Sequence, residues 1–427
     1  MLGCSPGGRA TDGPGPGDAE ADAPLPPDAC TGLECQVVPC ERMGRPTTSV
    51  SGMIHAPNGT LPLYGVTVYV PNSDPGELED GVKCTNCAEQ LPGTPITRAI
   101  SNELGRFTIA NVPSGVDIPL IITVGKWRRR ITIPSVTACT DNPVDPELTR
   151  LPKNKAEGDI PKIALVAGSC DALECLPRKL GIADSEFTSD SGDGRIHLYT
   201  ANGVSSLSNG STLAAATTLW SNLDKMKQYD IMLYGCECSR AAAGKPLASM
   251  LNLKAYADAG GRAFLSHYHN VWIVGQSASQ QPPVWPSIAQ CSVDSLANAT
   301  AVIDEVNNPK GPSFALWMQY VMGSTIPGRI PILEPKRTCT SIDNTKAERW
   351  IHSQNTTEPQ IFQFTTPNEA ASNARCGKIV FSDMHVASGS TSTNPFPNGC
   401  SNQPLSPQEK ALAFMFFDIA ACVEVIQ

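Results

Sequence analysis

Three histidines and an aspartate stand at the ends of two short apolar segments, and these residue types can bind a metal ion or transfer a proton. His267 and His269 directly follow the first segment, and Asp383 and His385 follow the second. On an extended segment, residues two apart face the same way, so the first two imidazoles would share a side. If the segments are parallel neighbours, all four side chains converge at the carboxyl edge of a sheet. Two histidines with a third histidine or a carboxylate would suit zinc, with a fourth position open for water.

Two alternatives compete with this site. Histidines at strand ends are often hydrogen-bonded members of a buried polar cluster, with no metal and no catalytic role. Ser266 precedes His267 and is a candidate nucleophile, but adjacent strand residues point to opposite faces, which places the imidazole badly for activating it. Cys236 and Cys238 end an earlier apolar run. We interpret them as a disulfide or as structural thiols, because a reactive cysteine needs a base and an electropositive setting.

The chain contains 16 cysteines, which predicts a disulfide framework and an extracytoplasmic location: periplasm, outer membrane or cell surface. Leu2-Gly3-Cys4 resembles the end of a bacterial lipobox and predicts a lipid anchor on Cys4, with a chance cysteine in a disordered leader as the alternative. Nine cysteines follow residue 150. Because nine is odd, that part must contain a free thiol or send a bridge to the front part.

Charge and hydropathy exclude two classes of partner. A net charge of −9 offers no basic surface for nucleic acid. No run of 18 apolar residues occurs, so we expect membrane attachment through the lipid alone. The one basic cluster surrounds Trp127, and strand alternation predicts this tryptophan in a core with Lys126 and Arg128 on a solvated face.

Composition divides the chain into four parts. Residues 1–28 are rich in Pro, Gly, Ala and Asp and predict a disordered tether, and residues 29–46 form a Cys-rich cap. Residues 47–150 show short alternating strands separated by turns, which is typical of an antiparallel β-sandwich. Residues 151–427 alternate buried-type strands with helices and predict an α/β domain with a mostly parallel sheet. The predicted class is therefore α+β multidomain.

The front domain resembles a known family. Four pieces in order carry the likeness: Ser51-Gly52-Met53-Ile54, Leu63-Tyr64-Gly65-Val66-Thr67-Val68, Asn102-Glu103-Leu104-Gly105-Arg106-Phe107 and Val112-Pro113-Ser114-Gly115. Together they resemble the carboxypeptidase regulatory-like domain, a transthyretin-like sandwich grouped with carbohydrate-binding-like folds. The resemblance implies a non-catalytic module and, as partner, a carbohydrate or cell-surface polymer.

Local signals locate the elements of the second domain. Runs 163–167, 229–234, 262–266 and 377–381 predict its strands. Asp171 is placed to cap a helix that reaches toward Leu180. Ser406-Pro407-Gln408-Glu409 is a capping box with proline at the first helical position, and it predicts a helix to about Cys422.

The second domain resembles the class I glutamine amidotransferase-like fold, especially its trehalose-utilisation branch. The segments that carry this likeness are 229–234, 256–264 and 376–382. In that family a cysteine follows the Gly-Gly-Arg strand at a sharp turn, with a histidine supplied later as base. Here the turn reads Ser266-His267-Tyr268-His269. Because no thiol stands there, we do not expect glutamine hydrolysis by the family mechanism.

Two functions remain. The first is a lipid-anchored binding or scaffold protein whose sandwich recognises a surface polymer and whose α/β domain lacks amidotransferase chemistry. The second is a secreted hydrolase-type enzyme that uses His267, His269 and His385 with zinc as the metal it would take. The missing cysteine at the turn favours the first, and the predicted convergence of the histidines keeps the second open.

Overall fold

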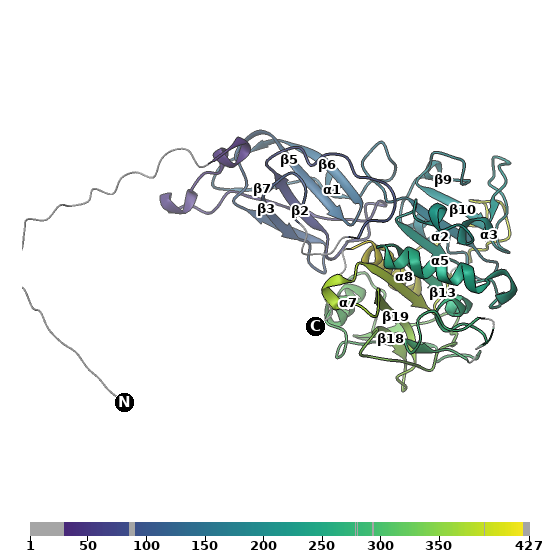
Figure 1. The fold of residues 1–427 in the computed structure, drawn as a ribbon. Coiled ribbons are helices and arrows are strands. Elements are labelled where there is room, and N and C mark those ends of the chain that lie inside the picture. Colours follow the sequence, from purple (N-terminus) through teal and green to yellow (C-terminus); the bar gives the residue numbers. More distant parts are fainter. Residues whose placement is uncertain are drawn as a thin grey trace, which may run out of the picture.

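The computed structural model describes residues 30–84, 90–277, 279, 281–292, 294–387 and 389–421. Within these ranges the chain forms a small two-sheet region followed by one large mixed sheet with helices (Figure 1). The predicted α+β class is confirmed. Cys4 and the predicted tether lie outside the described residues. Two short 3-10 turns, η1 (Gly32–Gln36) and η2 (Cys40–Met43), lead into the first sheet.

The front region contains two sheets with strand orders β4-β1-β7 and β3-β2-β5-β6. Neighbours are antiparallel except for β1 and β7, which are parallel. Side chains alternate between core and solvent, as β4 shows with Phe107 and Ile109 buried between exposed residues. The strands are β1 (Ser49–Met53), β2 (Thr67–Pro71), β3 (Pro95–Ile100), β4 (Arg106–Ala110), β5 (Gly115–Val124), β6 (Trp127–Val136) and β7 (Asp141–Pro143).

The large sheet has the order β11-β10-β8-β12-β13-β20-β19-β18-β15-β16, with β9 beside β10. It is parallel from β11 to β20 and antiparallel from β19 onward. Its strands are β8 (Ile163–Ala167), β9 (Phe187–Thr188), β10 (Ile196–Thr200), β11 (Ala214–Ala215), β12 (Ile231–Tyr234), β13 (Arg262–Ser266), β15 (Thr300–Ile303), β16 (Arg329–Pro331), β18 (Glu348–Ser353), β19 (Pro359–Thr366) and β20 (Gly377–Ser382). A separate pair joins β14 (Ala289–Gln290) to β17 (Ser341–Ile342).

The large sheet is covered on both faces, which explains why its parallel strands are apolar throughout. Along β8, Ile163 and Leu165 join one hydrophobic cluster while Ala164 and Val166 join another on the opposite face. The first cluster includes α7 (Gly311–Tyr320) and α8 (Pro407–Ala420). The second includes α3 (Thr217–Trp220), α4 (Leu223–Met226), α5 (Leu247–Asp258) and α6 (Val271–Val274). The remaining helices are α1 (Pro146–Thr149), α2 (Cys175–Lys179), η3 (Asp184–Glu186), η4 (Ala242–Gly244), η5 (His267–Asn270) and η6 (Ser372–Ala374).

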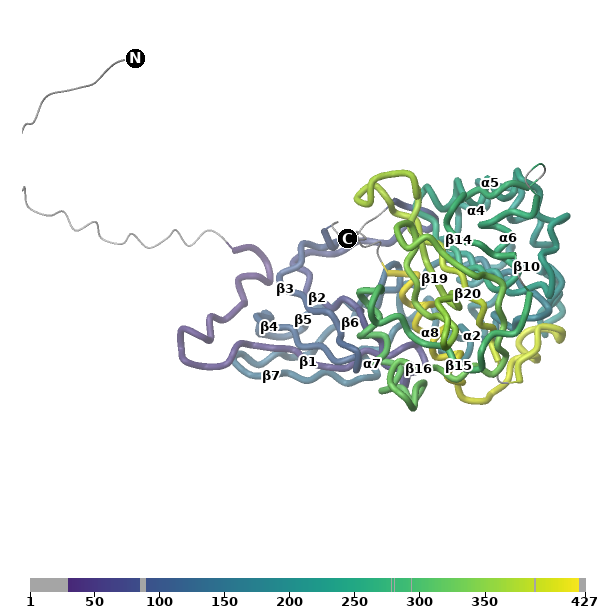
Figure 2. Tube along the Cα trace, turned by 90° about the horizontal axis from the view of Figure 1, so that it is seen from below, coloured from purple at the N-terminus to yellow at the C-terminus, as the bar shows by residue number. Residues whose placement is uncertain are grey.

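The two regions share one hydrophobic cluster, because the sandwich packs against α8 (Figure 2). Trp127 on β6 lies with its ring centroid 6.1 Å from that of Phe416 and 5.9 Å from that of Phe417. The tryptophan is buried, as predicted. Arg128, predicted to face solvent, is buried as well and forms an ion pair with Asp159. The prediction of a solvated face was wrong because the α/β region covers this end of β6.

Six disulfides link described residues: Cys30–Cys35, Cys40–Cys139, Cys84–Cys376, Cys170–Cys238, Cys175–Cys400 and Cys291–Cys339. They indicate an oxidising, extracytoplasmic location. Cys84–Cys376 joins the front part of the chain to β20, and Cys236 is a buried free thiol. None of the described helices has the length and apolar character that crossing a membrane requires.

Candidate functional site

Three consecutive parallel strands each deliver one side chain to the same edge of the large sheet. Cys236 comes two residues after β12, His267 one residue after β13, and His385 three residues after β20. These strands are direct neighbours in the order β12-β13-β20, so their carboxyl ends lie side by side. The fold therefore brings together three side chains, of which Cys236 and His385 are 149 positions apart in the chain.

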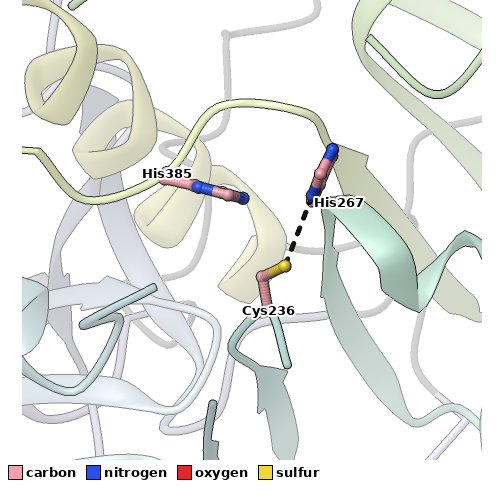
Figure 3. A group of neighbouring side chains, drawn as sticks. All are labelled: Cys236, His267 and His385. Atoms are coloured by element: carbon pink, nitrogen blue, oxygen red, sulfur yellow. Dashed lines mark hydrogen bonds between the residues drawn. The ribbon is translucent and has the colours of Figure 1, made fainter. Parts of the chain in front are cut away.

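The three side chains are close enough to share one ligand. Their donor atoms, one sulfur and two imidazole nitrogens, all lie within 4.8 Å of one another. Cys236 Sγ and His267 Nδ1 are hydrogen-bonded at 3.3 Å, and the two imidazole rings lie edge to face with centroids 4.9 Å apart. Figure 3 shows the ring of His385 pointing toward the space beside the other two side chains.

The cluster is buried and incompletely hydrogen-bonded. Cys236 is 0% exposed, and His267 and His385 are 3% exposed each. The Nε2 atoms of both histidines have no hydrogen-bond partner among the residues that the structure describes. A buried polar atom without a partner costs about 1–3 kcal/mol, so two such atoms beside a free thiol call for an additional ligand.

Burial sets the protonation of the cluster. It lowers the pKa of His267 to about 3, with the neighbouring His385 adding to the effect, and it lowers the pKa of His385 to about 4. It also raises the pKa of the Cys236 thiol to about 12. Without a ligand, the site thus contains two neutral imidazoles and a neutral thiol near pH 7. Neutral imidazole is the form that binds a metal, and a cysteine loses its proton when it does so.

Asp171 connects the loops that carry the cluster. Its carboxyl accepts a hydrogen bond from Ser266 Oγ at 2.5 Å and from the backbone N–H of Val386 at 2.9 Å. Burial raises the pKa of Asp171 to about 7, while bonds from Ser266, Val386 and the Cys236 backbone oppose the rise. Asp171 was predicted to cap a helix, but α2 begins at Cys175 without a side-chain cap. Instead, Asp171 fixes the residues next to His267 and His385.

His269, a predicted site residue, is not part of the cluster, and both of its ring nitrogens are bonded to other groups. Its Nε2 donates to the backbone oxygen of Gly235 at 2.9 Å, and its Nδ1 accepts from Trp272 Nε1 at 2.9 Å. The prediction assumed an extended segment, whereas the chain turns at once into η5, with a φ of 49° at His267. In this turn the two imidazoles no longer share a side.

Asp383 is also held elsewhere. Its carboxylate accepts from Thr338 Oγ1 at 2.7 Å and from the Thr338 backbone N–H at 2.9 Å, and burial raises its pKa to about 7. It anchors the segment next to Cys339 on the adjacent loop. The structure therefore brings together His267 and His385 of the four predicted residues, but not His269 or Asp383.

Cys236 is the member of the site that we did not predict. Of the two alternatives that we weighed, the disulfide fits Cys238, which pairs with Cys170, and the structural thiol fits Cys236, which is buried and free; neither included a place beside His267. The odd number of cysteines after residue 150 signalled a free thiol or an outgoing bridge, but not which cysteine. The position of Cys236 at the end of β12 was the available clue, since β12 and β13 are parallel neighbours.

A sulfur and two imidazole nitrogens form a ligand set for a borderline or soft transition metal such as zinc or copper. On tetrahedral zinc, with bonds of about 2.0–2.3 Å, such donors lie roughly 3.3–3.7 Å apart. The 3.3 Å contact between Cys236 and His267 already has this length. Because the three donor atoms lie within 4.8 Å of one another, an ion would have to draw the more distant of them closer by about 1 Å. The residues present thus fit a three-ligand site with one coordination position left over.

No protein-family model matches the chain, and no curated protein matches it. Among solved structures, the chain is similar to a ThuA-like protein from Bacteroides uniformis ATCC 8492, with 12% identity and a TM-score of 0.29 over 60% of this chain and 89% of that one. It is also similar to two interface mutants of a type II cohesin–X-dockerin complex from Acetivibrio cellulolyticus. These have 18% and 19% identity and TM-scores of 0.16 and 0.17, and they cover 35% and 31% of this chain and 79% and 84% of those chains. At such values the likenesses say nothing about activity.

Proposed function

We propose that this protein is an extracytoplasmic metal-binding protein that holds a transition-metal ion on Cys236, His267 and His385. One observation carries the proposal: a free thiol and two buried imidazoles offer donor atoms within 4.8 Å of one another at three adjacent strand ends. A bound ion beside Cys236 Sγ would replace the hydrogen bond to His267 Nδ1 and can take the Nε2 of His385 as a ligand, while the Nε2 of His267 points to the other side of its ring.

The environment of Cys236 supports this role. Twelve of the thirteen cysteines in the described ranges are paired, as expected in an oxidising compartment. A thiol that stays free there is exposed to oxidation unless it is shielded or bound to a metal. Cys236 is fully buried. The neighbouring Cys238 is held by Cys170, so the nearest cysteine in sequence is not available to it.

Burial also bears on the hydrolase alternative. A catalytic zinc needs its open position to be accessible to water and substrate. All three proposed ligands are at most 3% exposed, so a polymeric substrate cannot reach the ion without a movement of the surrounding loops. The geometry therefore favours metal storage, transfer or structural binding over hydrolysis of a polymer. Attachment through Cys4 and recognition of a surface polymer remain proposals alongside the metal site.

The test is metal analysis of protein secreted in oxidised form and purified without chelator. We expect about one equivalent of zinc or copper, and at least a tenfold loss of affinity in the Cys236→Ser and His385→Ala variants. His352→Ala is the matched control, because His352 lies on β18 outside the cluster and should leave metal content unchanged. X-ray absorption should show one sulfur and two nitrogen ligands.

Two results would overturn the proposal. One is folded protein that contains no metal and takes up neither zinc nor copper(I) on reconstitution. The other is metal that stays fully bound in Cys236→Ser. A reactive Cys236 that is alkylated rapidly in the folded, metal-free protein would instead favour nucleophilic chemistry by the thiol.

A further inference from the structure

A cavity lies where the sandwich meets the α/β region, and none of Cys236, His267 and His385 lines it. Its volume is about 580 Å³, within the usual range for small-molecule sites. The sandwich loop 58–62 forms one wall and is fixed on both sides. The Asn58 backbone N–H donates to Leu180 O at 2.8 Å, and Trp317 Nε1 donates to Pro62 O at 2.9 Å. The cavity is thus bounded by elements that already contact one another.

The lining is basic in an acidic protein. Arg178, Lys179 and Lys410 line the cavity, and neither aspartate nor glutamate is among its lining residues. The whole chain nevertheless has a net charge of −9. Carboxylates outside the lining already pair with Arg178 and Lys179, so the positive charge that favours an anionic ligand here is mainly that of Lys410.

The three cations differ in how they are held. Arg178 forms an ion pair with Asp184, and Lys179 forms one with Glu409. Lys410 donates to the backbone oxygen of Met322 at 3.3 Å, and no carboxylate within the described residues forms an ion pair with it. Partial burial lowers the pKa of Lys410, as expected for an ammonium group without a counter-ion. Lys410 is therefore the cation whose ion pair with a ligand carboxylate would contribute most to binding.

The rest of the lining suits a sugar. Exposed Thr60, Asn402 and Gln403 offer a hydroxyl and two amides, which can bond the hydroxyls of a ligand. Tyr320 is 44% exposed and Met322 is 78% exposed at the end of α7. An exposed aromatic ring beside polar groups can stack on the apolar face of a pyranose.

We propose that this inter-domain cavity binds an acidic sugar, through a carboxylate on Lys410 and Arg178 and sugar hydroxyls on the amides of Asn402 and Gln403. The ligand class is a uronic acid or a short oligosaccharide that contains one. This inference is independent of the metal site. It places carbohydrate recognition at the junction of the two regions instead of on the sandwich alone, where Tyr69 and Trp127 are buried.

The experiment is isothermal titration of the full chain with digalacturonate, with lactose as a neutral disaccharide and inorganic phosphate as a plain anion. We expect digalacturonate to bind, and to bind more weakly at higher salt because a charge pair contributes. Lys410→Ala should weaken binding about tenfold or more, the usual effect of removing a charge-assisted hydrogen bond. Tyr320→Ala should weaken it too. Lys155→Ala is the control, since that lysine is exposed and does not line the cavity.

Each other outcome contradicts the proposal. If lactose binds as tightly as digalacturonate, the carboxylate contributes nothing to binding. If phosphate binds as tightly, the cavity is an adventitious anion site without sugar recognition. Absence of digalacturonate binding, or unchanged binding by Lys410→Ala, would overturn the site. Circular dichroism and melting curves of each variant show whether a loss of binding reflects misfolding, and Lys410→Met provides a second test that keeps an unbranched side chain of similar length without the charge. None of these results depends on whether Cys236 binds a metal.

Discussion

At the scale of single residues, the disulfide Cys170–Cys238 decides whether Cys236 stays a thiol. The Cys170 N–H donates to Cys236 O at 3.0 Å, so the two loops already touch. We expect Cys238→Ser to leave Cys170 free to pair with Cys236, with loss of bound metal. The double variant Cys170→Ser/Cys238→Ser should keep the metal, because Cys236 then has no nearby thiol. Thiol mapping by mass spectrometry with metal analysis tests this, and full metal retention in the single variant would contradict it.

Another residue-scale prediction concerns the dependence of stability on pH. Burial raises the pKa of Glu174 from 4.5 to about 8. Between these values the folded state holds a proton that the unfolded chain has lost, so the free energy of unfolding falls as pH rises. Glu174→Gln should flatten the slope between pH values of about 5 and 8 in urea denaturation. Glu157→Gln is the control, because the Arg150 hydrogen bond lowers the pKa of Glu157 to about 2, below this window. An unchanged slope in Glu174→Gln would refute the assignment.

At the scale of elements, the sequence was most informative where local signals agree with burial. The runs 163–167 and 262–266 match β8 and β13 in full, since a strand covered on both faces must be apolar throughout. The parallel order then placed His267 and His385 at one edge. His269 could not be placed this way, because a positive φ is rare even at histidine, so the turn at His267 cannot be predicted from the sequence. A count of cysteines does not identify which cysteines pair. The free thiol at Cys236 could therefore be identified only from the folded structure.

The capping box of α8 gives an element-scale test. Ser406 Oγ accepts from the Glu409 backbone N–H, and the Glu409 carboxylate accepts from the Ser406 N–H at 2.8 Å, as predicted from the sequence. Ser406→Ala should lower the free energy of unfolding by about 1 kcal/mol. Ser406→Asp should keep most of the stabilisation that the cap provides, because aspartate also accepts the hydrogen bond at this position. Denaturant titration measures both. Equal stability of the alanine and aspartate variants would mean that the cap contributes nothing.

At the scale of the whole molecule, the shared core predicts that sandwich and α/β region unfold together. Trp127 contributes to the same hydrophobic cluster as Phe416 and Phe417, and Cys84–Cys376 ties the front part of the chain to β20. Separate domains would melt independently, whereas a continuous core couples them. We therefore expect a single transition in calorimetry. Hydrogen exchange should show amides of the sandwich and of the large sheet losing protection together.

Trp127→Ala tests that coupling directly. Truncating a buried tryptophan typically costs about 3–5 kcal/mol, so the variant should melt well below the wild type and expose amides of α8 as well as β6. Ile100→Ala is the control, because Ile100 is an exposed side chain of the sandwich and its removal should change stability by less than about 0.5 kcal/mol. If Trp127→Ala splits the melt into two transitions with α8 still protected, the α/β region is stable alone. The cavity between the two regions would then lie at a contact between separately folded parts, and this contact could open. Ligand binding in the cavity should in that case raise the melting temperature of the lower transition and leave the higher one unchanged.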